Sequence, residues 1–407
     1  MARHVITESK RCLKCKNARC TASCPVETPV AEFISLYLDG KIKEAGELLF
    51  RNNPLSVVTS LVCPHSEMCE GSCIRGIKST PIEVGEIEHY VSDYYLNIMD
   101  LKPEKQLDHR IAIIGSGPAG ITIAFLMALK GYKVTIFEAH DKIGGVMRYG
   151  IPEFRLPKSI LERLKEKLLA LGVKIRPNTI IGKVITLDDL CRDAYKAVFI
   201  GTGVWKPYTL GVKGETLGNV HFAIDYLKNP EVYTLGDHLT VIGAGNVAMD
   251  VARTALRNGT KDVTVMYRKT MAEMSARDEE IEAAKMDGVT FEVLKTPVEF
   301  MDDGIIYNTV INKEGSFETE DERKLYDTNS IIVSISQGPQ ANIISTTEGI
   351  DVSQKGLVKT NEFGKTTREG IFASGDVVTG AKTVVEAVKY SKTVVKAMDE
   401  YIKNKYD

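Results

Sequence analysis

The ten residues IAIIGSGPAG at positions 111–120 decide the fold of this 407-residue chain. Four apolar residues predict a buried strand, and the spacing G-x-G-x-x-G predicts the tight turn that joins a strand to a helix. The helix is expected to run to Lys130, where Gly131 ends it, and residues 134–137 have the pattern of a second strand. The stretch therefore predicts a βαβ unit of a parallel sheet.

Each glycine of this fingerprint has a physical role in binding a dinucleotide. Gly115 permits the tight turn, Gly117 lets the backbone approach a pyrophosphate, and Gly120 allows close packing of helix on strand. The phosphates then lie at the positive end of the helix. Glu138, directly after the second strand, is the acid expected to accept hydrogen bonds from a ribose. A turn that binds nothing would not explain why strand, helix, strand and acid occur in this order.

Residues 111–129 carry no charge and are long enough to suggest a membrane span. The glycine turn divides them into strand, turn and helix, so a buried βα unit explains them better. Over the whole chain 52 Lys and Arg nearly balance 54 Asp and Glu, which favours neither nucleic acid nor an anionic membrane as a partner. The first residues lack the apolar core of a signal peptide, and we expect a cytoplasmic protein.

The βαβ pattern occurs a second time, with strands expected at 239–242 and 263–266. The turn between them is GAGNVA, and the spacing from Gly243 to Gly259 equals that from Gly115 to Gly131. The residues of this turn that are expected to contact a second dinucleotide are Gly243, Gly245, Asn246 and Val247.

The residue after the second strand differs between the two copies, and this difference indicates the coenzyme. In place of Glu138 the second copy has Tyr267, followed by Arg268 and Lys269. A carboxylate would repel a 2′-phosphate, whereas a guanidinium can bind one through two hydrogen bonds. We therefore expect NADPH in preference to NADH. The alternative is that the two basic residues form a solvated turn.

Seven of the eight cysteines lie in the first 73 residues, in two groups: Cys12, Cys15, Cys20 and Cys24, then Cys63, Cys69 and Cys73. A Cys-x2-Cys pair with a later Cys-Pro is typical of the bacterial ferredoxin run, and iron–sulfur clusters are predicted. A structural zinc site usually needs four ligands in paired knuckles, so two such sites would need eight. Disulfides are disfavoured by a reducing compartment and by the odd count.

Two four-iron clusters need eight ligands, and only seven cysteines are nearby. The eighth cysteine, Cys191, lies far along the chain and is expected to be a packed small hydrophobe. The remaining ligand is therefore expected to be oxygen or nitrogen. Glu86, Glu88 and His89 stay open as candidates from the residues alone.

Nearly the whole chain resembles one family of flavoenzymes. This family comprises the small subunit of bacterial glutamate synthase, the N-terminal half of dihydropyrimidine dehydrogenase, and the flavin subunit of the bacterial two-subunit dihydropyrimidine dehydrogenase. Besides the cysteines and fingerprints, the resemblance rests on GIPEFRLP at 150–157 and KTVVEAV at 382–388.

The resemblance implies an α/β chain in which a helical N-terminal domain with two [4Fe-4S] clusters precedes two Rossmann-like domains of the disulfide-reductase type. Its implied domains are an iron–sulfur domain at 1–105, an FAD domain in two segments at 106–236 and 337–407, and an NAD(P)H domain at 237–336. Within them we expect helices at 28–38, 42–51 and 383–403 and further strands at 197–200 and 331–335.

The resemblance also implies site residues. One cluster would be held by Cys12, Cys15, Cys20 and Cys73, and the other by Cys24, Cys63, Cys69 and an oxygen ligand matching Glu88. The implied FAD contacts are Gly115, Gly117, Pro118, Ala119, Gly120, Glu138, Gly145, Arg155, Gly375, Asp376 and Thr383. The implied contacts of the NADPH phosphate are Arg268, Lys269 and Arg277.

The expected function is an NAD(P)H oxidoreductase that passes electrons through FAD and two [4Fe-4S] clusters to a partner flavoenzyme in a hetero-oligomer. A dihydropyrimidine dehydrogenase-type partner is favoured, and a glutamate synthase-type or electron-bifurcating complex is the alternative. No catalytic side chain is expected, because the cofactors carry the chemistry. A disulfide reductase would need a Cys-x-x-Cys beside the flavin, and residues 110–407 contain only Cys191. A nucleotide-binding regulator is the non-enzymatic alternative.

Overall fold

The computed structural model describes residues 2–313 and 315–406, and these form two compact units. Unit 1 comprises Met1–Arg148, Glu153–Val204 and Pro339–Asp407. Unit 2 comprises Tyr149–Pro152 and Trp205–Gly338. In the described part of the chain, every helix is too short or too polar to cross a lipid bilayer.

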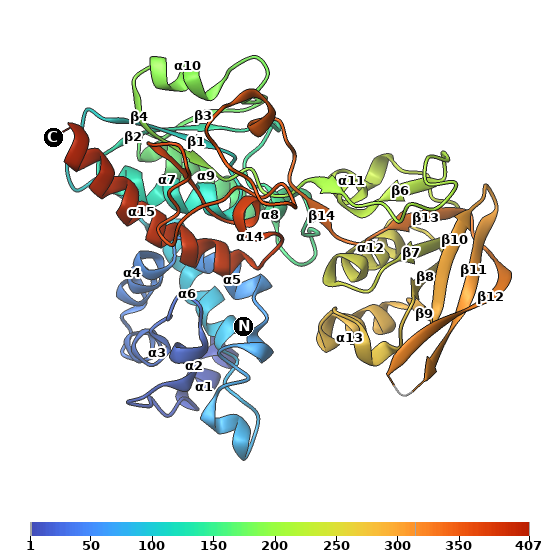
Figure 1. Ribbon diagram of the computed structural model, residues 1–407. Helices are drawn as coiled ribbons and strands as arrows, with labels where there is room; N and C mark the ends of the chain where they lie inside the picture. The colour runs from blue at the N-terminus through green and yellow to red at the C-terminus, as the bar shows by residue number, and fades with distance from the viewer. Residues whose placement is uncertain (1, 314, 407) are drawn as a thin grey trace. The chain divides into compact units, whose positions relative to one another are not determined.

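Unit 1 is built on a parallel sheet of five strands in the order β15-β4-β1-β2-β3 (Figure 1). Their bounds are Arg110–Ile114 (β1), Lys133–Phe137 (β2), Lys174–Arg176 (β3), Tyr195–Ile200 (β4) and Ile371–Ala373 (β15). The apolar run that starts the fingerprint is buried because both faces of the sheet are covered. The parallel order confirms the βαβ unit expected from the sequence.

The helices of this sheet layer include a long C-terminal helix. Their bounds are Pro118–Leu129 (α7), Val146–Tyr149 (α8), Lys158–Ala170 (α9), Leu187–Arg192 (α10), Asp376–Thr379 (α14) and Val384–Tyr406 (α15). α15 packs along α7, and Asp399 on α15 accepts a 2.7 Å hydrogen bond from the Tyr132 hydroxyl next to the end of α7. Residues far apart in sequence thus complete one layer.

The N-terminal part of unit 1 is helical, as the sequence predicts. Its α-helices are Ala2–Lys10 (α1), Arg19–Ser23 (α2), Val30–Leu38 (α3), Ile42–Asn52 (α4), Ser56–Val62 (α5) and Val84–Ile98 (α6). Two 3-10 turns, His65–Glu67 and Ile74–Ile77, carry the chain between α5 and α6. The helices enclose an apolar core that includes Phe33, Ile34, Leu49 and Ile87. Six of the seven N-terminal cysteines lie in the segments that join these helices, and Cys20 lies in α2.

The helical part packs directly against the sheet layer of unit 1. The rings of Phe50 on α4 and Phe125 on α7 meet edge to face, with centroids 5.4 Å apart. Arg163 on α9 donates hydrogen bonds of 2.5 Å to Asp93 and 2.8 Å to Asn97, both on α6. Apolar and polar contacts therefore hold the helical part against the sheet layer that carries the first fingerprint.

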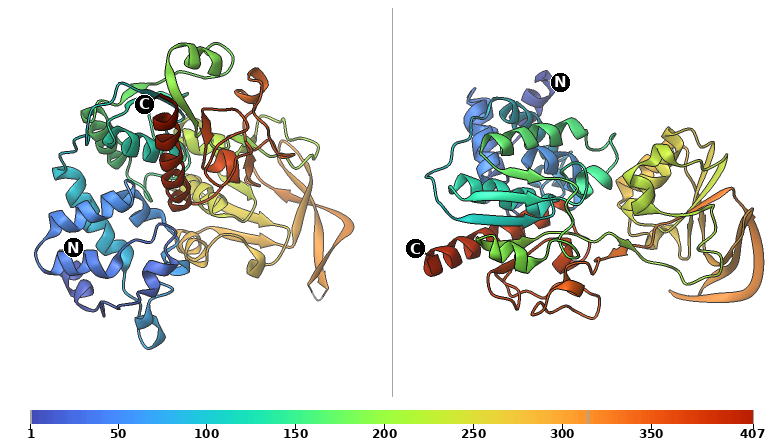
Figure 2. Two further views of the ribbon diagram at one scale, coloured as in Figure 1. Left: turned by 60° about the vertical axis from the view of Figure 1, so that its left-hand side comes forward. Right: turned by 90° about the horizontal axis from the view of Figure 1, so that it is seen from above.

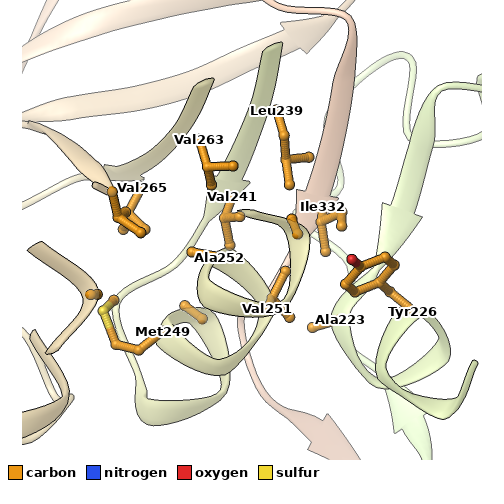
Figure 3. Packing of buried hydrophobic residues seen from close by; sticks show 14 of the residues in the cluster. Ala223, Tyr226, Leu239, Val241, Met249, Val251, Ala252, Val263, Val265 and Ile332 are labelled. Atoms are coloured by element: carbon orange, nitrogen blue, oxygen red, sulfur yellow. The ribbon is translucent and has the colours of Figure 1, made fainter. Parts of the chain in front are cut away.

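Unit 2 repeats the parallel architecture in the order β6-β13-β7-β8-β9. The strands are Val220–Phe222 (β6), His238–Ile242 (β7), Asp262–Tyr267 (β8), Thr290–Val293 (β9) and Ser330–Val333 (β13), and the helices are Ala223–Lys228 (α11), Asn246–Arg257 (α12) and Asp278–Asp287 (α13). The side chains of Leu239, Val241, Val263 and Val265 pack against α12 (Figure 3). β6 and α11 precede residue 236, so unit 2 begins earlier than the nucleotide domain expected from the sequence.

Unit 2 also contains an antiparallel sheet that was not predicted from the sequence. Its strands are Lys295–Phe300 (β10), Gly304–Lys313 (β11) and Ser316–Asp327 (β12), and Figure 2 shows the last two as a long curved hairpin. Phe300 and Ile305 share a core with Ile242 of the parallel sheet. The start of β11 is mostly buried, whereas β12 is exposed along nearly its whole length and its sequence carries little apolar pattern.

Two short segments, Lys206–Pro207 (β5) and Gln337–Gly338 (β14), pair antiparallel with each other. They lie near the two ends of the long segment of unit 2.

Candidate functional site

The first fingerprint has the close backbone packing that its glycines require. Gly115 has φ 93°, which is left-handed backbone, and a Cβ on Gly120 would lie 2.0 Å from the Gly115 carbonyl oxygen. A Cβ on Gly117, by contrast, would meet no heavy atom nearer than Gly145 Cα at 4.0 Å. The turn therefore leaves open space beside Gly117, where a pyrophosphate would approach the start of α7.

Gly145 belongs to the same place although it is 28 residues further along the chain. It has φ 51°, and a Cβ there would lie 2.6 Å from Gly117 Cα. Its neighbour Gly144 donates a 3.0 Å backbone hydrogen bond to the Ser116 carbonyl oxygen. The loop before α8 is thus fixed against the fingerprint by backbone contacts and by a 3.2 Å hydrogen bond from the Gly144 N–H to the Ser116 hydroxyl.

Glu138 is buried beside the fingerprint, with an exposed fraction of 4%. Its carboxylate accepts 2.9 Å hydrogen bonds from the backbone N–H groups of Ser116 and His140. Burial alone would raise the pKa of Glu138, but hydrogen bonds from His140 and Ser116 outweigh it and lower the pKa. The group is therefore an anion that is already oriented, as a ribose acceptor needs to be.

The C-terminal segment of unit 1, Pro339–Asp407, also reaches the fingerprint. Gly375, with φ 76°, precedes α14, and a Cβ there would lie 3.1 Å from the Ala119 Cβ. The next residue, Asp376, is mostly buried, and burial raises its pKa to about 7. Its carboxylate accepts a 3.2 Å hydrogen bond from the Lys382 backbone N–H. The structure therefore brings Gly117, Gly145 and Gly375 together around the start of α7.

Other residues expected near FAD have structural roles in addition. Pro118 occupies the first turn of α7, where its missing N–H is not needed. The Thr383 hydroxyl accepts a 3.3 Å hydrogen bond from the Glu386 backbone N–H and so caps α15, and it donates one of 2.7 Å to the Glu386 carboxylate. Arg155 is half-buried between α8 and α9.

The second fingerprint matches the first in register. Ile114 pairs with Phe137, and Ile242 pairs with Met266, so Tyr267 takes the place of Glu138. Gly243 has φ 136°, and a Cβ there would lie 2.1 Å from the Ser334 carbonyl oxygen. A Cβ on Gly245 would meet only the Ser275 hydroxyl, at 3.5 Å. The turn before α12 therefore leaves open space beside its second glycine, as the turn before α7 does.

The basic residues around the second fingerprint differ in their surroundings. Arg268 is exposed directly after β8, and Lys269 lies over the Phe317 ring at 5.3 Å. Arg277 donates its backbone N–H to the Asn246 side-chain oxygen at 3.0 Å, and its guanidinium forms a 2.9 Å ion pair with Glu280. The buried Nε of Arg277 has no hydrogen-bond partner among the described residues.

Val247 is partly buried and packs on the core of unit 2, so its side chain has a structural role. Its position in the first turn of α12 places its backbone N–H at the same helix end as Asn246.

Four cysteines from three segments border one small cavity. Cys12, Cys15, Cys20 and Cys73 line a space of about 90 Å³ together with apolar side chains such as Val30 and Val84. Burial raises the pKa of the Cys12 and Cys20 thiols. Bound iron would supply the positive charge that stabilises these groups as thiolates. Four sulfur donors around one apolar cavity fit the ligand set of a four-iron cluster.

A second group forms around Cys69, which is buried. Burial raises the pKa of the Cys69 thiol, and the neighbouring charges of Glu88, Glu70 and Cys24 raise it further. Glu88 on α6 is 7% exposed, and burial raises its pKa to about 8. A buried carboxylate and two thiols without a cation are electrostatically unfavourable together, which fits a site for bound metal. Cys63 directly follows α5 in the same helical part.

The structure separates the three candidates for the eighth ligand. Glu86 is exposed and lies 3.3 Å from His4. The Nδ1 atom of His89 lies 3.3 Å from the Ser60 hydroxyl. Glu88, in contrast, lies buried beside Cys69. The surroundings of these side chains favour Glu88, in agreement with the resemblance.

Relatives of this chain carry the same combination of modules. Residues 109–391 match the pyridine nucleotide-disulphide oxidoreductase family, and residues 1–99 match the family of dihydropyrimidine dehydrogenase domain II, 4Fe-4S cluster. The glutamate synthase [NADPH] small chain of Halomonas elongata is 31% identical over 97% of this chain and 90% of its own length. The NAD-dependent dihydropyrimidine dehydrogenase subunit PreT of Salmonella typhimurium is 30% identical over 98% of this chain and 94% of its own length.

Two further comparisons cover a smaller share of one of the two proteins compared. The putative oxidoreductase AegA of Escherichia coli is 31% identical over 97% of this chain, which spans 65% of AegA. Among solved structures, FprA of Mycobacterium tuberculosis in complex with NADPH matches 73% of this chain and 85% of its own, with a TM-score of 0.60 and 17% identity. That likeness is one of fold.

The two family matches agree with the two observations of the site. One is a dinucleotide fold with two fingerprints, and the other is an N-terminal cysteine domain. The chain belongs to the pyridine nucleotide-disulphide oxidoreductase family, as an FAD-dependent NAD(P)H oxidoreductase with an N-terminal 4Fe-4S domain of the dihydropyrimidine dehydrogenase type.

Proposed function

We propose that this chain is the electron-input subunit of a two-component enzyme, which oxidises NAD(P)H and delivers the electrons to a separate catalytic flavoenzyme subunit. A dihydropyrimidine dehydrogenase-type partner is the first candidate. The observation that carries the proposal is that one unit holds both the cysteine cavity and the first fingerprint. When bound, FAD accepts hydride from the nicotinamide, and iron–sulfur clusters accept single electrons.

The residues of the chain bind and orient rather than react. Gly145 approaches Gly117 as closely as only a glycine can, Glu138 offers an oriented carboxylate, and Asp376 is the first residue of α14. Electron transfer between cofactors requires no acid or base from the protein. Cys191 on α10 is exposed and far in sequence from any other cysteine, which argues against disulfide reduction despite the family name.

The two cysteine groups differ in their surroundings, and this difference supports an order of electron transfer between them. The Lys392 ammonium on α15, in the FAD segment, lies close enough to Cys24 to interact with its charge. The Cys12 and Cys73 segments instead carry exposed apolar residues, Leu13 and Ile77. We assign the group of Cys24, Cys63, Cys69 and Glu88 to the flavin side, and the group of Cys12, Cys15, Cys20 and Cys73 to the exit side.

NADPH is the proposed coenzyme. Arg268, Lys269 and Arg277 place three basic side chains around the second fingerprint, and the register puts Tyr267 where an acid would repel a 2′-phosphate. The named relatives divide on this point, since one is described as NADPH-dependent and the other as NAD-dependent.

A glutamate synthase-type partner is the second candidate. Glu88 favours it, because the resemblance places a glutamate at this position in glutamate synthase and a glutamine in the mammalian pyrimidine enzyme. The H. elongata small chain is also a relative over nearly the whole chain.

Anaerobic purification followed by iron, sulfide and flavin analysis tests the proposal. We expect one flavin and about eight iron and eight sulfide per chain, and rapid bleaching of the flavin by NADPH. Stoichiometric zinc, or a flavin that NAD(P)H does not reduce, would contradict it. Reconstitution with the product of a neighbouring gene, assayed for uracil reduction and for glutamate formation, separates the two partners.

A further inference from the structure

The two segments that border the four-cysteine cavity are strongly basic. Residues 10–20 and 71–80 contain no aspartate or glutamate. Their basic residues are Lys10, Arg11, Lys14, Lys16, Arg19, Arg75 and Lys78. The whole chain has a formal net charge of −2, so this local excess is not a consequence of overall composition.

Most of these charges are exposed and not neutralised. Arg11 is bound by Glu8 at 2.6 Å, and Arg75 is half-buried. The other five are exposed, and within the described ranges 2–313 and 315–406 they form no ion pair: Lys10, Lys14, Lys16, Arg19 and Lys78. The nearby acids Glu83 and Glu86 lie at 3.1 and 3.3 Å from His4. The segments that border the cavity therefore carry five exposed basic side chains with which no described carboxylate forms an ion pair.

The same segments also expose large apolar side chains. Leu13 is 58% exposed, Ile74 is 44% exposed and Ile77 is 66% exposed. Single exposed apolar residues are ordinary. These three, however, directly follow Cys12 or lie within four residues after Cys73, and both cysteines line the cavity. Apolar side chains surrounded by charged residues are typical of a protein–protein interface.

We propose that this surface, defined as Leu13, Lys14, Lys16, Arg19, Ile74, Ile77 and Lys78 and called the cavity rim, docks a one-electron acceptor protein with an acidic face and an apolar centre. The inference rests on the proposed function, because it identifies the partner of the exit side. Opposite charges steer such an acceptor and speed its association. Each NAD(P)H yields NAD(P)⁺, one proton and two electrons, which pass singly to the acceptor: a flavoenzyme subunit takes both, and two single-haem probe molecules take one each.

The test uses the complete holoprotein under anaerobic conditions with two haem proteins as probes. The soluble domain of cytochrome b5 is acidic, and cytochrome c is basic. Wild-type protein with NADPH is expected to reduce cytochrome b5 faster than cytochrome c, and the cytochrome b5 rate should fall about tenfold between about 20 mM and about 300 mM salt. A faster rate with cytochrome c, or no salt dependence, would overturn the proposal.

A double variant and a matched control locate the effect. Ile77→Ser with Lys78→Glu is expected to slow cytochrome b5 reduction about tenfold, with flavin bleaching and ferricyanide reduction unchanged. The control is Val184→Ser with Lys183→Glu, an exposed apolar and basic pair that precedes α10, at the opposite end of unit 1 from α1 and α2 in Figure 1. Equal rates in the two variants would reject the cavity rim as the docking surface.

Two further outcomes are distinguishable. If wild-type protein is a dimer by light scattering and the Ile77→Ser/Lys78→Glu protein is a monomer, a second copy occupies the rim and the proposal fails. If wild-type protein reduces neither its own flavin nor ferricyanide with NAD(P)H, the proposed function fails first.

Discussion

The Lys392 Nζ atom donates a 3.0 Å hydrogen bond to the side-chain oxygen of Asn52, a residue 340 positions earlier in the chain. Lys392 lies on α15 in the C-terminal FAD segment, whereas Asn52 is the last residue of α4. Burial lowers the pKa of Lys392 and the charge of Lys396 lowers it further, while Glu27 and Cys24 act in the opposite direction. A partly buried ammonium group therefore lies beside the second cysteine group, where the helical part meets the sheet layer.

Replacing Lys392 with methionine should lower the reduction potential of the cluster assigned to Cys24. A reduced cluster carries one more negative charge, and the nearby ammonium stabilises that charge. A redox titration followed by electron paramagnetic resonance measures the effect. Lys396→Met, an exposed lysine one turn further along α15, is the control. An unchanged potential in Lys392→Met, or an equal shift in both variants, would show that Lys392 has no specific influence.

Replacing Glu88 with alanine should remove or alter one cluster while flavin reduction by NADPH continues. Glu88 is buried beside Cys69, so a lost oxygen ligand leaves that iron incompletely coordinated. Glu86→Ala on the exposed face of α6 should leave both clusters intact. Iron content and low-temperature spectra provide the measurement. Normal cluster spectra in the Glu88 variant would shift the assignment to His89.

Replacing Gly145 with alanine should weaken FAD binding severely. The residue has φ 51°, and the new Cβ would lie 2.6 Å from Gly117 Cα, so the loop would have to move away from the fingerprint. Gly172→Ala is the matched control, since Gly172 also has positive φ, 82°, but open space around its Cβ. Flavin content per chain distinguishes the two. If both variants retain FAD equally, the contact with Gly117 does not shape the site.

Replacing Arg268 with alanine should weaken NADPH binding more than NADH binding, by on the order of 1–3 kcal/mol for a lost charge-assisted contact. The side chain is exposed next to the strand end that in the first copy carries Glu138. Dissociation constants for both coenzymes, taken from flavin reduction, give the comparison. Arg323→Ala on exposed β12 is the control for a general loss of positive charge. Equal losses for NADPH and NADH would count against recognition of the 2′-phosphate.

FAD binding should weaken as the pH falls below 7, because of Asp376. In the flavin-free chain burial raises the pKa of this carboxyl to about 7. A ribityl hydroxyl that donates to the carboxylate would lower the pKa in the complex, so binding releases a proton below pH 7 and none well above it. The affinity should then fall by up to about tenfold per pH unit below 7. Flavin fluorescence titrations between about pH 6 and pH 8 measure this.

The Asp376→Asn variant provides the control for this dependence. The amide cannot titrate, so the slope with pH should disappear while the side-chain volume is kept. A variant that retains the wild-type slope would assign the proton to another group.

The sequence was sufficient for the parts of the fold whose physics is local. The fingerprint strands, turns and helices were predicted because four apolar residues and three spaced glycines restrict the backbone over a dozen residues. The helices expected at 28–38 and 42–51 are Val30–Leu38 and Ile42–Asn52 in the structure, within two residues at each end. The antiparallel sheet was missed because its exposed strand β12 is determined by pairing with β11 rather than by its own pattern.

In the candidate site, too, some features follow from the local sequence and others depend on the packing of distant segments. Glu86 and Glu88 are two residues apart on one helix, so they point to different faces, and the sequence does not state which face is buried. The contact of Gly145 with Gly117, and the meeting of Cys73 with Cys12, depend on how distant segments pack. The sequence by itself therefore determined the family, the nucleotide folds and the supply of thiols, because short-range backbone sterics and residue chemistry define them. Only the tertiary structure decided which carboxylate lies beside the thiols and which cysteines share a cavity, because burial depends on the packing of the whole unit.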